Sequence, residues 1–474
     1  MTSKPNIILI VMDTVRADHL PGWGYPRKTT PCLDEFSKSA IVFKQAISAS
    51  PWTLPSHVSM FSGLHPTEHG VLTSGQRAGE DIPLIADILR INGYNTAGFT
   101  NNPWASAVYS LDRGFNHFVE VYKEEKRINK SLLSEGKEKL KRLFSMVDGG
   151  AERTNEHVEK WLNAAGYNKT PFFVFINYMD AHVPYLAKRA FPANLSCNSI
   201  SAIIKSRKFY KNPGEICIGS IEPSQKDFDS VIKIYDDAIC YLDCKIGELL
   251  DFLKKNSLFD NTMIIVTSDH GENFGEHKSL HKGVLVLHEF CLYDTLLHVP
   301  LIVKLPFEKK RSVEVHKQVQ LTNIPSMILE TVGMEFSVPG QSGSTGKLGE
   351  LENDEDGKDE SYAFSEYVSE PAHLMGIERA NPDLVRKFDL ELKSVRNKQH
   401  KLIVSNKSEP ELYNLDEDPG ELRNVAGELT DILKRLKQKI ESWQNRKTKL
   451  YSTKGMNPVD NEEIKKRLQA LGYF

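Results

Sequence analysis

The stretch MIIVTSDHG, Met263–Gly271, joins a strand-like run to side chains that can bind a ligand. Its first four residues form a short apolar run bounded by polar residues, which is typical of a strand buried in a parallel sheet. Asp269 and His270 follow almost at once. In open α/β sheets ligands bind outside the carboxyl ends of the strands, so this stretch predicts both a fold class and a site.

Three other apolar runs have the same character: Ile7–Met12, Phe172–Ile176 and Leu301–Val303. We interpret all of them as buried parallel strands. Helical patterns lie between the runs, at Asp81–Asn92 and, as a long amphipathic segment, at Phe228–Leu253. The alternation predicts an α/β sandwich in which helices flank a large, mostly parallel sheet.

We expect residues 1–375 to form the catalytic domain and residues 376–474 a small C-terminal α+β subdomain with a tail. Two stretches interrupt the catalytic part, a charged one at about 123–153 and a polar, turn-rich one at about 190–225. Both are interpreted as surface insertions over the carboxyl edge of the sheet. Residues 340–360 are acidic and polar, as expected of a linker.

The C-terminal subdomain has a simple expected organisation. Ser394–Val404 and Glu411–Leu415 are expected to pair as short antiparallel strands, and Leu422–Trp443 is expected to form a helix. We therefore expect a smaller antiparallel sheet with a helix beside the main sheet.

The composition is that of an ordinary globular protein, with 474 residues, 40% hydrophobic, 26% charged and a net charge of −3. It gives no basic face of the kind that nucleic acids require, so no nucleic-acid partner is expected. No apolar run approaches about 20 residues, so we expect no membrane span and a cytoplasmic location. The six cysteines are scattered and are interpreted as mostly free thiols. The oligomeric state is left open.

Acids and imidazoles follow three of the predicted strands. Asp13 comes directly after the first strand, His182 follows the second, and Asp269 and His270 follow the third. Because the carboxyl ends of parallel strands meet at one edge of a sheet, these groups are expected to converge. Two carboxylates and an imidazole suit a divalent cation.

Thr53 opens the segment TLPSH, Thr53–His57. Pro55 suits a first helical turn, and Ser56–Phe61 can continue as helix, which places Thr53 at a helix N-terminus where free N–H groups favour an anion. A hydroxyl there that touches a metal ion would lose its proton readily and become a nucleophile. The alternative is a plain N-cap.

The chain resembles the sulfatase family of the alkaline phosphatase superfamily, nearly from end to end. The family's closing segment is matched by ELYNLDEDPGELRNVA. The other similar segments occur in the family's order and are PNIILIVMDTVRADHLPGWGYPRKTTPCLDEFSKSAIVFKQAIS, TLPSHVSMFSGLHPTEHG, GYNTAGF, YMDAHVPY, TSDHGENFGEH, HKG and VPLIV. The resemblance implies an alkaline-phosphatase-like fold and an ester hydrolase.

The resemblance implies that Asp13, Asp269, His270 and Thr53 bind one divalent metal ion and that Thr53 is the nucleophile. Two departures bear on the metal: sulfatases usually have a second acid where this chain has Thr14, and many have Asn where it has His270. Fewer carboxylates and an added imidazole favour manganese or zinc, with calcium as the alternative.

The resemblance also implies roles on the substrate side. His182 and Lys282 correspond to the side chains that grip the ester oxyanion and assist the leaving group. His57 stands where the family commonly has Arg, in reach of the nucleophile or the anion. The family's anion-binding Lys after the GYxT strand is missing, and Asn101 and Asn102 stand in its place, as in relatives that act on phosphodiesters or phosphonate monoesters.

Thr53 itself bears on the substrate. Sulfatases have Cys or Ser at this position and convert it to formylglycine, whereas Thr is no substrate for that maturation. A covalent Thr53 intermediate must therefore be released by water attacking the anion, a route that favours phosphate diesters or phosphonates. The alternatives are a true sulfuric ester hydrolase, a phosphoglycerol- or phosphoethanolamine-type transferase, and a degenerate fold that only binds. In every case except the degenerate fold, the partner is a small anionic ester.

Overall fold

The computed structural model describes most of the chain. Most of the two predicted insertions, nearly all of the predicted linker, the tail and Lys282 lie outside the described residues. The described residues are 4–123, 149–164, 170–185, 213–278, 283–308, 312–334, 348 and 361–446.

The described residues form a nine-stranded main sheet with the strand order β10-β2-β9-β6-β1-β5-β3-β4, and β11 also pairs with β2. The central strand β1 is parallel to both of its neighbours, β5 and β6. The three predicted strands at this centre are confirmed, each with a slightly wider extent. The strands are β1 (Asn6–Met12), β2 (Ile41–Ile47), β3 (Asn95–Thr100), β4 (His117–Glu120), β5 (Phe172–Tyr178), β6 (Thr262–Thr267), β9 (His298–Lys304), β10 (Val313–Val315) and β11 (Val319–Gln320).

The prediction of a parallel strand at Leu301–Val303 is wrong in direction. The strand exists as β9, but it runs antiparallel to both β6 and β2. A continuous apolar run shows that a strand is buried and does not encode its direction. The chain reverses just before β9, where the backbone of Gly271 donates to the Leu296 carbonyl at 2.8 Å. That contact places the start of β9 beside the end of β6.

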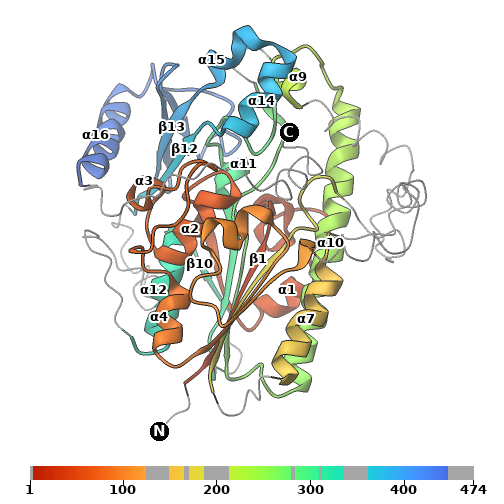
Figure 1. The fold of residues 1–474 in the computed structure, drawn as a ribbon. Helices are drawn as coiled ribbons and strands as arrows, with labels where there is room; N and C mark the ends of the chain where they lie inside the picture. Colours follow the sequence, from red (N-terminus) through yellow and green to blue (C-terminus); the bar gives the residue numbers. More distant parts are fainter. Residues whose placement is uncertain are drawn as a thin grey trace.

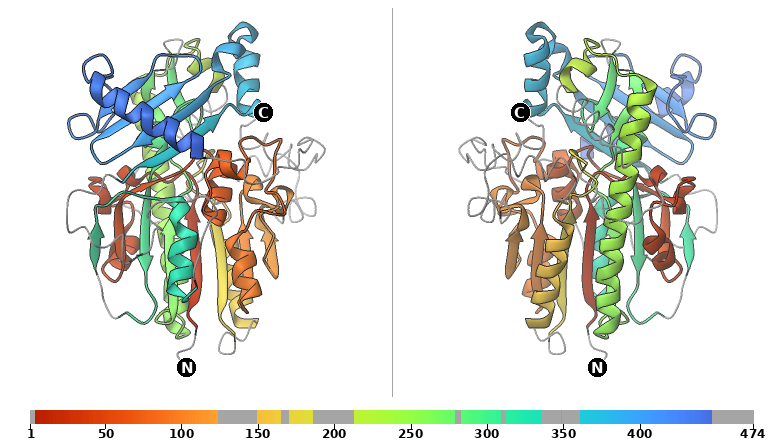
Figure 2. Two further views of the ribbon diagram at one scale, coloured as in Figure 1. Left: turned by 90° about the vertical axis from the view of Figure 1, so that its left-hand side faces the viewer. Right: turned by 90° about the vertical axis from the view of Figure 1, so that its right-hand side faces the viewer.

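Helices cover both faces of the main sheet (Figures 1 and 2). On one face lie α1 (Pro31–Ser37), α7 (Ala151–Ala164) and α10 (Gln225–Lys255). On the other face lie α2 (Thr53–Ser62), α4 (Ile85–Ile91) and α12 (Ile324–Thr331). The sandwich predicted from the sequence is therefore present.

The two predicted helices are found with different bounds. The long amphipathic segment is α10, which extends a little beyond the prediction at both ends. The helix predicted over Asp81–Asn92 begins only at Ile85. Pro83 disfavours helical conformation at Ile82, and Leu84 is the extended N-cap residue, so the helix begins only after it.

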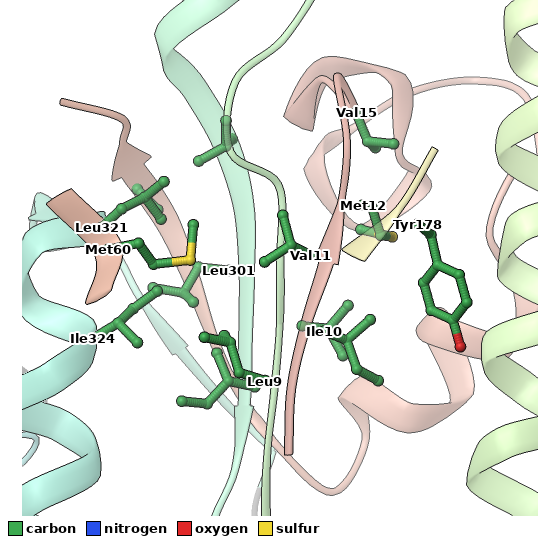
Figure 3. Close-up of a cluster of buried hydrophobic side chains, with 14 of the residues drawn as sticks. Leu9, Ile10, Val11, Met12, Val15, Met60, Tyr178, Leu301, Leu321 and Ile324 are labelled. Atoms are coloured by element: carbon green, nitrogen blue, oxygen red, sulfur yellow. The ribbon is translucent and has the colours of Figure 1, made fainter. Parts of the chain in front are cut away.

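The core is centred on β1, whose residues Ile7 to Met12 are at most 1% exposed. Figure 3 shows Val11 on the side of Met60 from α2, and Met12 on the side of Tyr178. Alternate side chains of the strand therefore pack in both helical layers, which is why its sequence is continuously apolar. Burying one such side chain contributes about 1.5–3 kcal/mol, so the strand end that carries Asp13 is held rigidly.

A four-stranded antiparallel sheet with the order β12-β13-β14-β15 lies above the ends of the main strands in Figure 1. Phe364 of this sheet stacks on Trp443 of α16, with ring centroids 4.6 Å apart. The Ser365 hydroxyl donates to the Ser48 carbonyl at 2.6 Å, so the sheet contacts the segment that precedes α2. Its elements are β12 (Ala363–Val368), β13 (Glu391–Arg396), β14 (His400–Ser405), β15 (Glu411–Asn414) and α16 (Thr430–Arg446).

The C-terminal predictions are confirmed in part. β14 and β15 pair antiparallel as expected, but the stretch 394–404 contains parts of two strands instead of one. The predicted helix at 422–443 begins at Thr430. The small sheet also includes β12, which lies before the predicted limit at residue 375. The division into two domains stays a prediction.

The described helices include none that is long and apolar enough to cross a bilayer.

The remaining elements are short. These elements are η1 (Ala17–His19), η2 (Pro21–Trp23), α3 (Pro66–His69), η3 (Pro103–Ala105), η4 (Ala107–Tyr109), η5 (Val121–Lys123), α9 (Pro213–Cys217), β7 (Asn273–Lys278), β8 (Val284–Leu287), α11 (Asp294–Leu297), η6 (Leu321–Asn323), α14 (Pro371–Ala380), η7 (Pro382–Leu384) and α15 (Val385–Phe388).

Candidate active site

The candidate site lies where β1 and β6 end and α2 begins. Asp13 follows β1, Asp269 and His270 follow β6, and Thr53 is the first residue of α2. All four side chains are completely buried. One ligand atom from each of Asp13, Asp269 and His270 lies within 4.8 Å of the others. The predicted convergence of these three residues is therefore present.

Asp13 is held through one carboxylate oxygen. Its Oδ2 accepts hydrogen bonds from the amides of Asn102 at 2.7 Å and Asn177 at 3.1 Å. Its Oδ1 is buried and has no hydrogen-bond partner among the described residues. A buried, unpartnered carboxylate oxygen is unfavourable unless a cation occupies its open side.

Asp269 repeats this arrangement. Its Oδ1 accepts the backbone N–H groups of Thr14 at 3.3 Å and His270 at 3.0 Å. Its Oδ2 is buried without a hydrogen bond in the described part of the chain, and His57 Nδ1 and His270 Nε2 each lie 3.5 Å from it. Burial raises the pKa of Asp269, and the neighbouring Asp13 raises it further.

Thr14 supports Asp269 through an unusual backbone conformation. Its φ is 61°, a left-handed value that is rare for a β-branched residue. This conformation aims its N–H at Asp269, while its hydroxyl donates to the Ala181 carbonyl at 2.9 Å. The side chain of Thr14 is thus occupied elsewhere and does not take the place of a second acid.

His270 is oriented as a neutral ligand. Its Nδ1–H donates to the Gly271 carbonyl at 2.9 Å, which leaves the Nε2 lone pair free to face the cluster. Burial lowers the pKa of His270, as does the nearby His288. Two unpartnered carboxylate oxygens and an imidazole nitrogen in one buried cluster fit a divalent cation.

Thr53 presents its hydroxyl to this cluster. Its Oγ1 lies 3.3 Å from His270 Nε2 and accepts from the Asn102 amide at 3.2 Å. The N-cap position of α2 belongs to Trp52, so the alternative that Thr53 is a plain N-cap is wrong. Ser56 fixes the helix end, because its hydroxyl donates to the Asp269 carbonyl at 2.7 Å.

His57 lies one turn along α2, behind the cluster. Its Nδ1–H donates to the Thr53 carbonyl at 2.9 Å, while its Nε2 is buried without a partner among the described residues. Burial lowers its pKa. His57 therefore contacts the backbone of Thr53 and not its hydroxyl.

His182 is nearby, but it is not in hydrogen-bond contact with Thr53. It is 2% exposed, and its Nδ1–H donates to the Val183 carbonyl at 2.6 Å. Its ring centroid lies 5.2 Å from that of His288, which in turn is 4.6 Å from the ring of His270. The prediction for Lys282 lies outside the described residues.

The two predicted substrate-binding asparagines have different environments. Asn102 is part of the cluster, as described above. The amide of Asn101 instead donates to the Thr154 hydroxyl at 2.6 Å and to the Asn177 carbonyl at 3.2 Å. The structure does not bring Asn101 to the site, because its side chain ties β3 to α7 and β5.

Three residues near the site were not assigned a role from the sequence. Asn177 could have been noticed as an amide in the otherwise apolar strand FFVFINY, Phe172–Tyr178. Glu272 lies two residues after His270 and is completely buried. His288 follows the short strand β8 and had no signal in the sequence.

The fold and this cluster together define a class of protein. A hydroxyl at a helix N-terminus, beside carboxylates that fit a divalent cation, at the carboxyl edge of an α/β sheet, is the arrangement of a hydrolase or transferase of anionic esters.

Comparison with known proteins identifies the family. Residues 5–334 match the family model "Sulfatase", and residues 285–446 match "N-sulphoglucosamine sulphohydrolase, C-terminal". The chain therefore belongs to the sulfatase family and is an ester hydrolase. Enzymes of this family use a divalent metal ion, and the described cluster offers ligands for one.

Individual relatives are distant. Arylsulfatase K of Mus musculus is 24% identical over 94% of this chain and 80% of its own length. The solved phosphonate monoester hydrolase of Agrobacterium radiobacter is 20% identical, with a TM-score of 0.71 over 94% of this chain and 96% of its own. A protein solved with its substrate D-glucosamine-2-N,6-O-disulfate is 18% identical, with a TM-score of 0.70 over 98% of this chain and 100% of its own.

Proposed function

We propose that this protein is a metal-dependent hydrolase of phosphate diesters or phosphonate monoesters that acts through a covalent intermediate on Thr53. The observation that carries the proposal is the position of the Thr53 hydroxyl. It lies 3.3 Å from His270 Nε2 and 3.2 Å from the Asn102 amide, beside two unpartnered carboxylate oxygens. The hydroxyl thus lies beside a group of possible cation ligands, where a nucleophile activated by a metal ion would be placed.

The metal ligands in this proposal are Asp13, Asp269, His270 and Thr53. When bound, a divalent cation supplies positive charge that lowers the pKa of a nearby hydroxyl and stabilises charge on the ester oxygens. The ligand set contains two carboxylates and one imidazole, which favours manganese or zinc over calcium, since calcium takes six to eight oxygen ligands.

The first chemical step forms the bond from Thr53 Oγ to phosphorus. Thr53 gives its hydroxyl proton to water, and the bond from phosphorus to the leaving oxygen breaks. His182 donates a proton from Nε2 to that oxygen, since its Nδ1 is fixed to the Val183 carbonyl. Lys282 is proposed to contact the ester oxyanion. The Asn102 amide donates to both Thr53 and Asp13 and so fixes these two side chains relative to each other.

The second step releases the intermediate. Water attacks phosphorus and gives a proton to the neutral His182, the bond between phosphorus and Thr53 Oγ breaks, and Thr53 takes up a proton from solvent. This route needs water to attack the anion itself, because Cβ of Thr53 carries only one oxygen and cannot expel the group by collapse to a carbonyl. Phosphoryl groups accept such attack more readily than sulfuryl groups, and this supports the preference for phosphorus.

Sulfate-ester hydrolysis is the second candidate, and it is favoured by the printed names of relatives such as Arylsulfatase K. A transferase that moves a phosphorus group to an alcohol is the third. The three candidates share the Thr53 intermediate and differ in the anion accepted and in the acceptor used for release.

The deciding experiment measures initial rates of the manganese- or zinc-loaded protein on matched nitrophenyl esters: a phosphate diester, a phosphonate monoester, a phosphate monoester and a sulfate. Thr53→Ala is expected to remove all turnover, and Thr53→Ser to keep it. A dominant sulfate rate would refute the phosphorus preference. Turnover that depends on an added alcohol would indicate the transferase, and undiminished turnover by Thr53→Ala would refute the covalent mechanism.

A further inference from the structure

Beside the proposed cation ligands lies a second buried pair, formed by Glu272 and His288. Their exposed fractions are 0% and 1%. Nδ1 of His288 lies 3.4 Å from Oε1 of Glu272, and the Tyr185 hydroxyl donates to Oε2 of Glu272 at 3.2 Å. A carboxylate held from both ends gives the imidazole of His288 a fixed anchor.

His288 contacts both histidines of the proposed mechanism. Its ring centroid lies 4.6 Å from that of His270, at an interplanar angle of 42°, and 5.2 Å from that of His182, at 60°. A single side chain thus joins the proposed cation ligand to the proposed proton donor. Close packing of flat rings restricts rotation of each one about its side-chain bonds.

The backbone around His288 is strained. Leu287 has a φ of 63° and Phe290 a φ of 62°, left-handed values that large side chains rarely adopt. Such strain concentrates at functional sites, where the surroundings impose it. Here the two strained residues lie on either side of His288, whose ring lies against His270 and His182.

We propose that His288 is a further residue of this active site, a positioning residue that Glu272 anchors and that fixes the ring orientations of His270 and His182. The proposal rests on the proposed function for the roles of those two histidines. His270 is held at Nδ1 by the Gly271 carbonyl, and His182 is held at Nδ1 by the Val183 carbonyl. These bonds fix one nitrogen of each ring, and His288 adds contact with the ring itself.

We expect the substitution of His288 to reduce both the affinity for the cation and kcat. Partners that orient a ligating histidine typically contribute 10–100-fold to metal affinity or activity. His288→Ala is therefore expected to weaken cation binding by roughly 10-fold or more through His270. It is also expected to lower kcat through His182, with a smaller change in KM. His288→Asn, whose amide can replace Nδ1 toward Glu272, is expected to recover part of both losses.

The test uses the full chain, first stripped with a chelator. Titration calorimetry with Mn²⁺ or Zn²⁺ gives the dissociation constant, and kcat and KM are measured on the best ester. The matched control is His277→Ala, because His277 is also buried, stacks on Tyr293 at 3.7 Å and bonds to the Gly420 carbonyl. This control is expected to lower the melting temperature and to leave the dissociation constant unchanged.

The outcomes separate this proposal from the proposed function. If wild type binds the cation and turns over an ester while His288→Ala matches it in both, the positioning role is refuted and the function stands. If wild type binds the cation without turnover, the function fails, and the ratio of dissociation constants still decides the contact with His270. If wild type binds no cation, both fail. Should His288→Ala not fold, His288→Ser, which also removes the ring, carries the same comparison.

Discussion

Asp269→Asn should have opposite effects on stability with and without the metal ion. In the metal-free protein Asp13 and Asp269 place ligand oxygens within 4.8 Å of each other. The substitution keeps Oδ1 as acceptor for Thr14 and His270, and it puts an amide donor in place of the unpartnered Oδ2. We therefore expect metal-free Asp269→Asn to be at least as stable as the metal-free wild type.

The magnitude follows from the geometry. Two full charges at 4.8 Å, the upper limit of their separation in the cluster, repel by about 3 kcal/mol at an effective dielectric constant of about 20. Because the pKa of Asp269 is raised by burial and by Asp13, the metal-free wild type avoids part of this repulsion by keeping a proton. The gain from the substitution therefore lies between about 0 and 3 kcal/mol. With the cation at about 1,000 times its dissociation constant, wild type gains about 4.1 kcal/mol that the variant lacks, which exceeds this range.

The assay is thermal or urea unfolding of both proteins, after chelation and again with excess Mn²⁺ or Zn²⁺. The stability curves should cross, with the variant equal or higher without metal and lower with it. Ser59→Ala is a suitable control, since the buried Ser59 bonds to His69 in α3 and its substitution should shift both conditions alike. A variant that is less stable without metal, or that gains as much as wild type from the metal, would refute this account of the site.

Three further predictions concern single side chains. Asn102→Ala should lower kcat/KM by about 100-fold, because it removes the amide that bonds both Asp13 and Thr53. Asn101→Ala should cost about 1–2 kcal/mol in urea unfolding and leave the chemistry intact. Burial raises the pKa of Asp237 on α10 to about 7, against the pull of Arg27. Folding therefore favours the protonated acid, and wild type loses stability as pH rises from about 4 to 7. The melting temperature of Asp237→Asn relative to wild type should rise over that range, and a constant difference would contradict the argument.

Much of the fold could be predicted because each central strand is buried on both faces and is continuously apolar. β1, β5 and β6 were found this way, and so were the acids that follow β1 and β6. The direction of β9 could not be predicted, since an apolar run indicates that a strand is buried but not whether it is parallel or antiparallel to its neighbours. β12 was missed because Ala363–Val368 includes Ser365 and Glu366, which are buried through polar contacts.

The sequence indicated several individual residues of the cluster, but it did not indicate the complete set of residues that surround them. The motifs identified Asp13, Asp269, His270 and Thr53, since all lie at element ends. They could not separate Asn101 from Asn102, because adjacent side chains at the end of a strand point in opposite directions. His288 reaches the site through tertiary packing alone, and no local pattern marks it.

Thr14 links these local details to the choice of cation. An acid at this position would add a carboxylate to the site only if its side chain faced the cluster, and the hydroxyl of Thr14 instead bonds to the Ala181 carbonyl. The left-handed backbone that aims the Thr14 N–H at Asp269 thus also turns its side chain away. The cluster is left with two carboxylates, whose combined charge balances one divalent cation. Too few oxygen ligands remain to complete a calcium shell, so the backbone conformation at one residue supports manganese or zinc in the proposed mechanism.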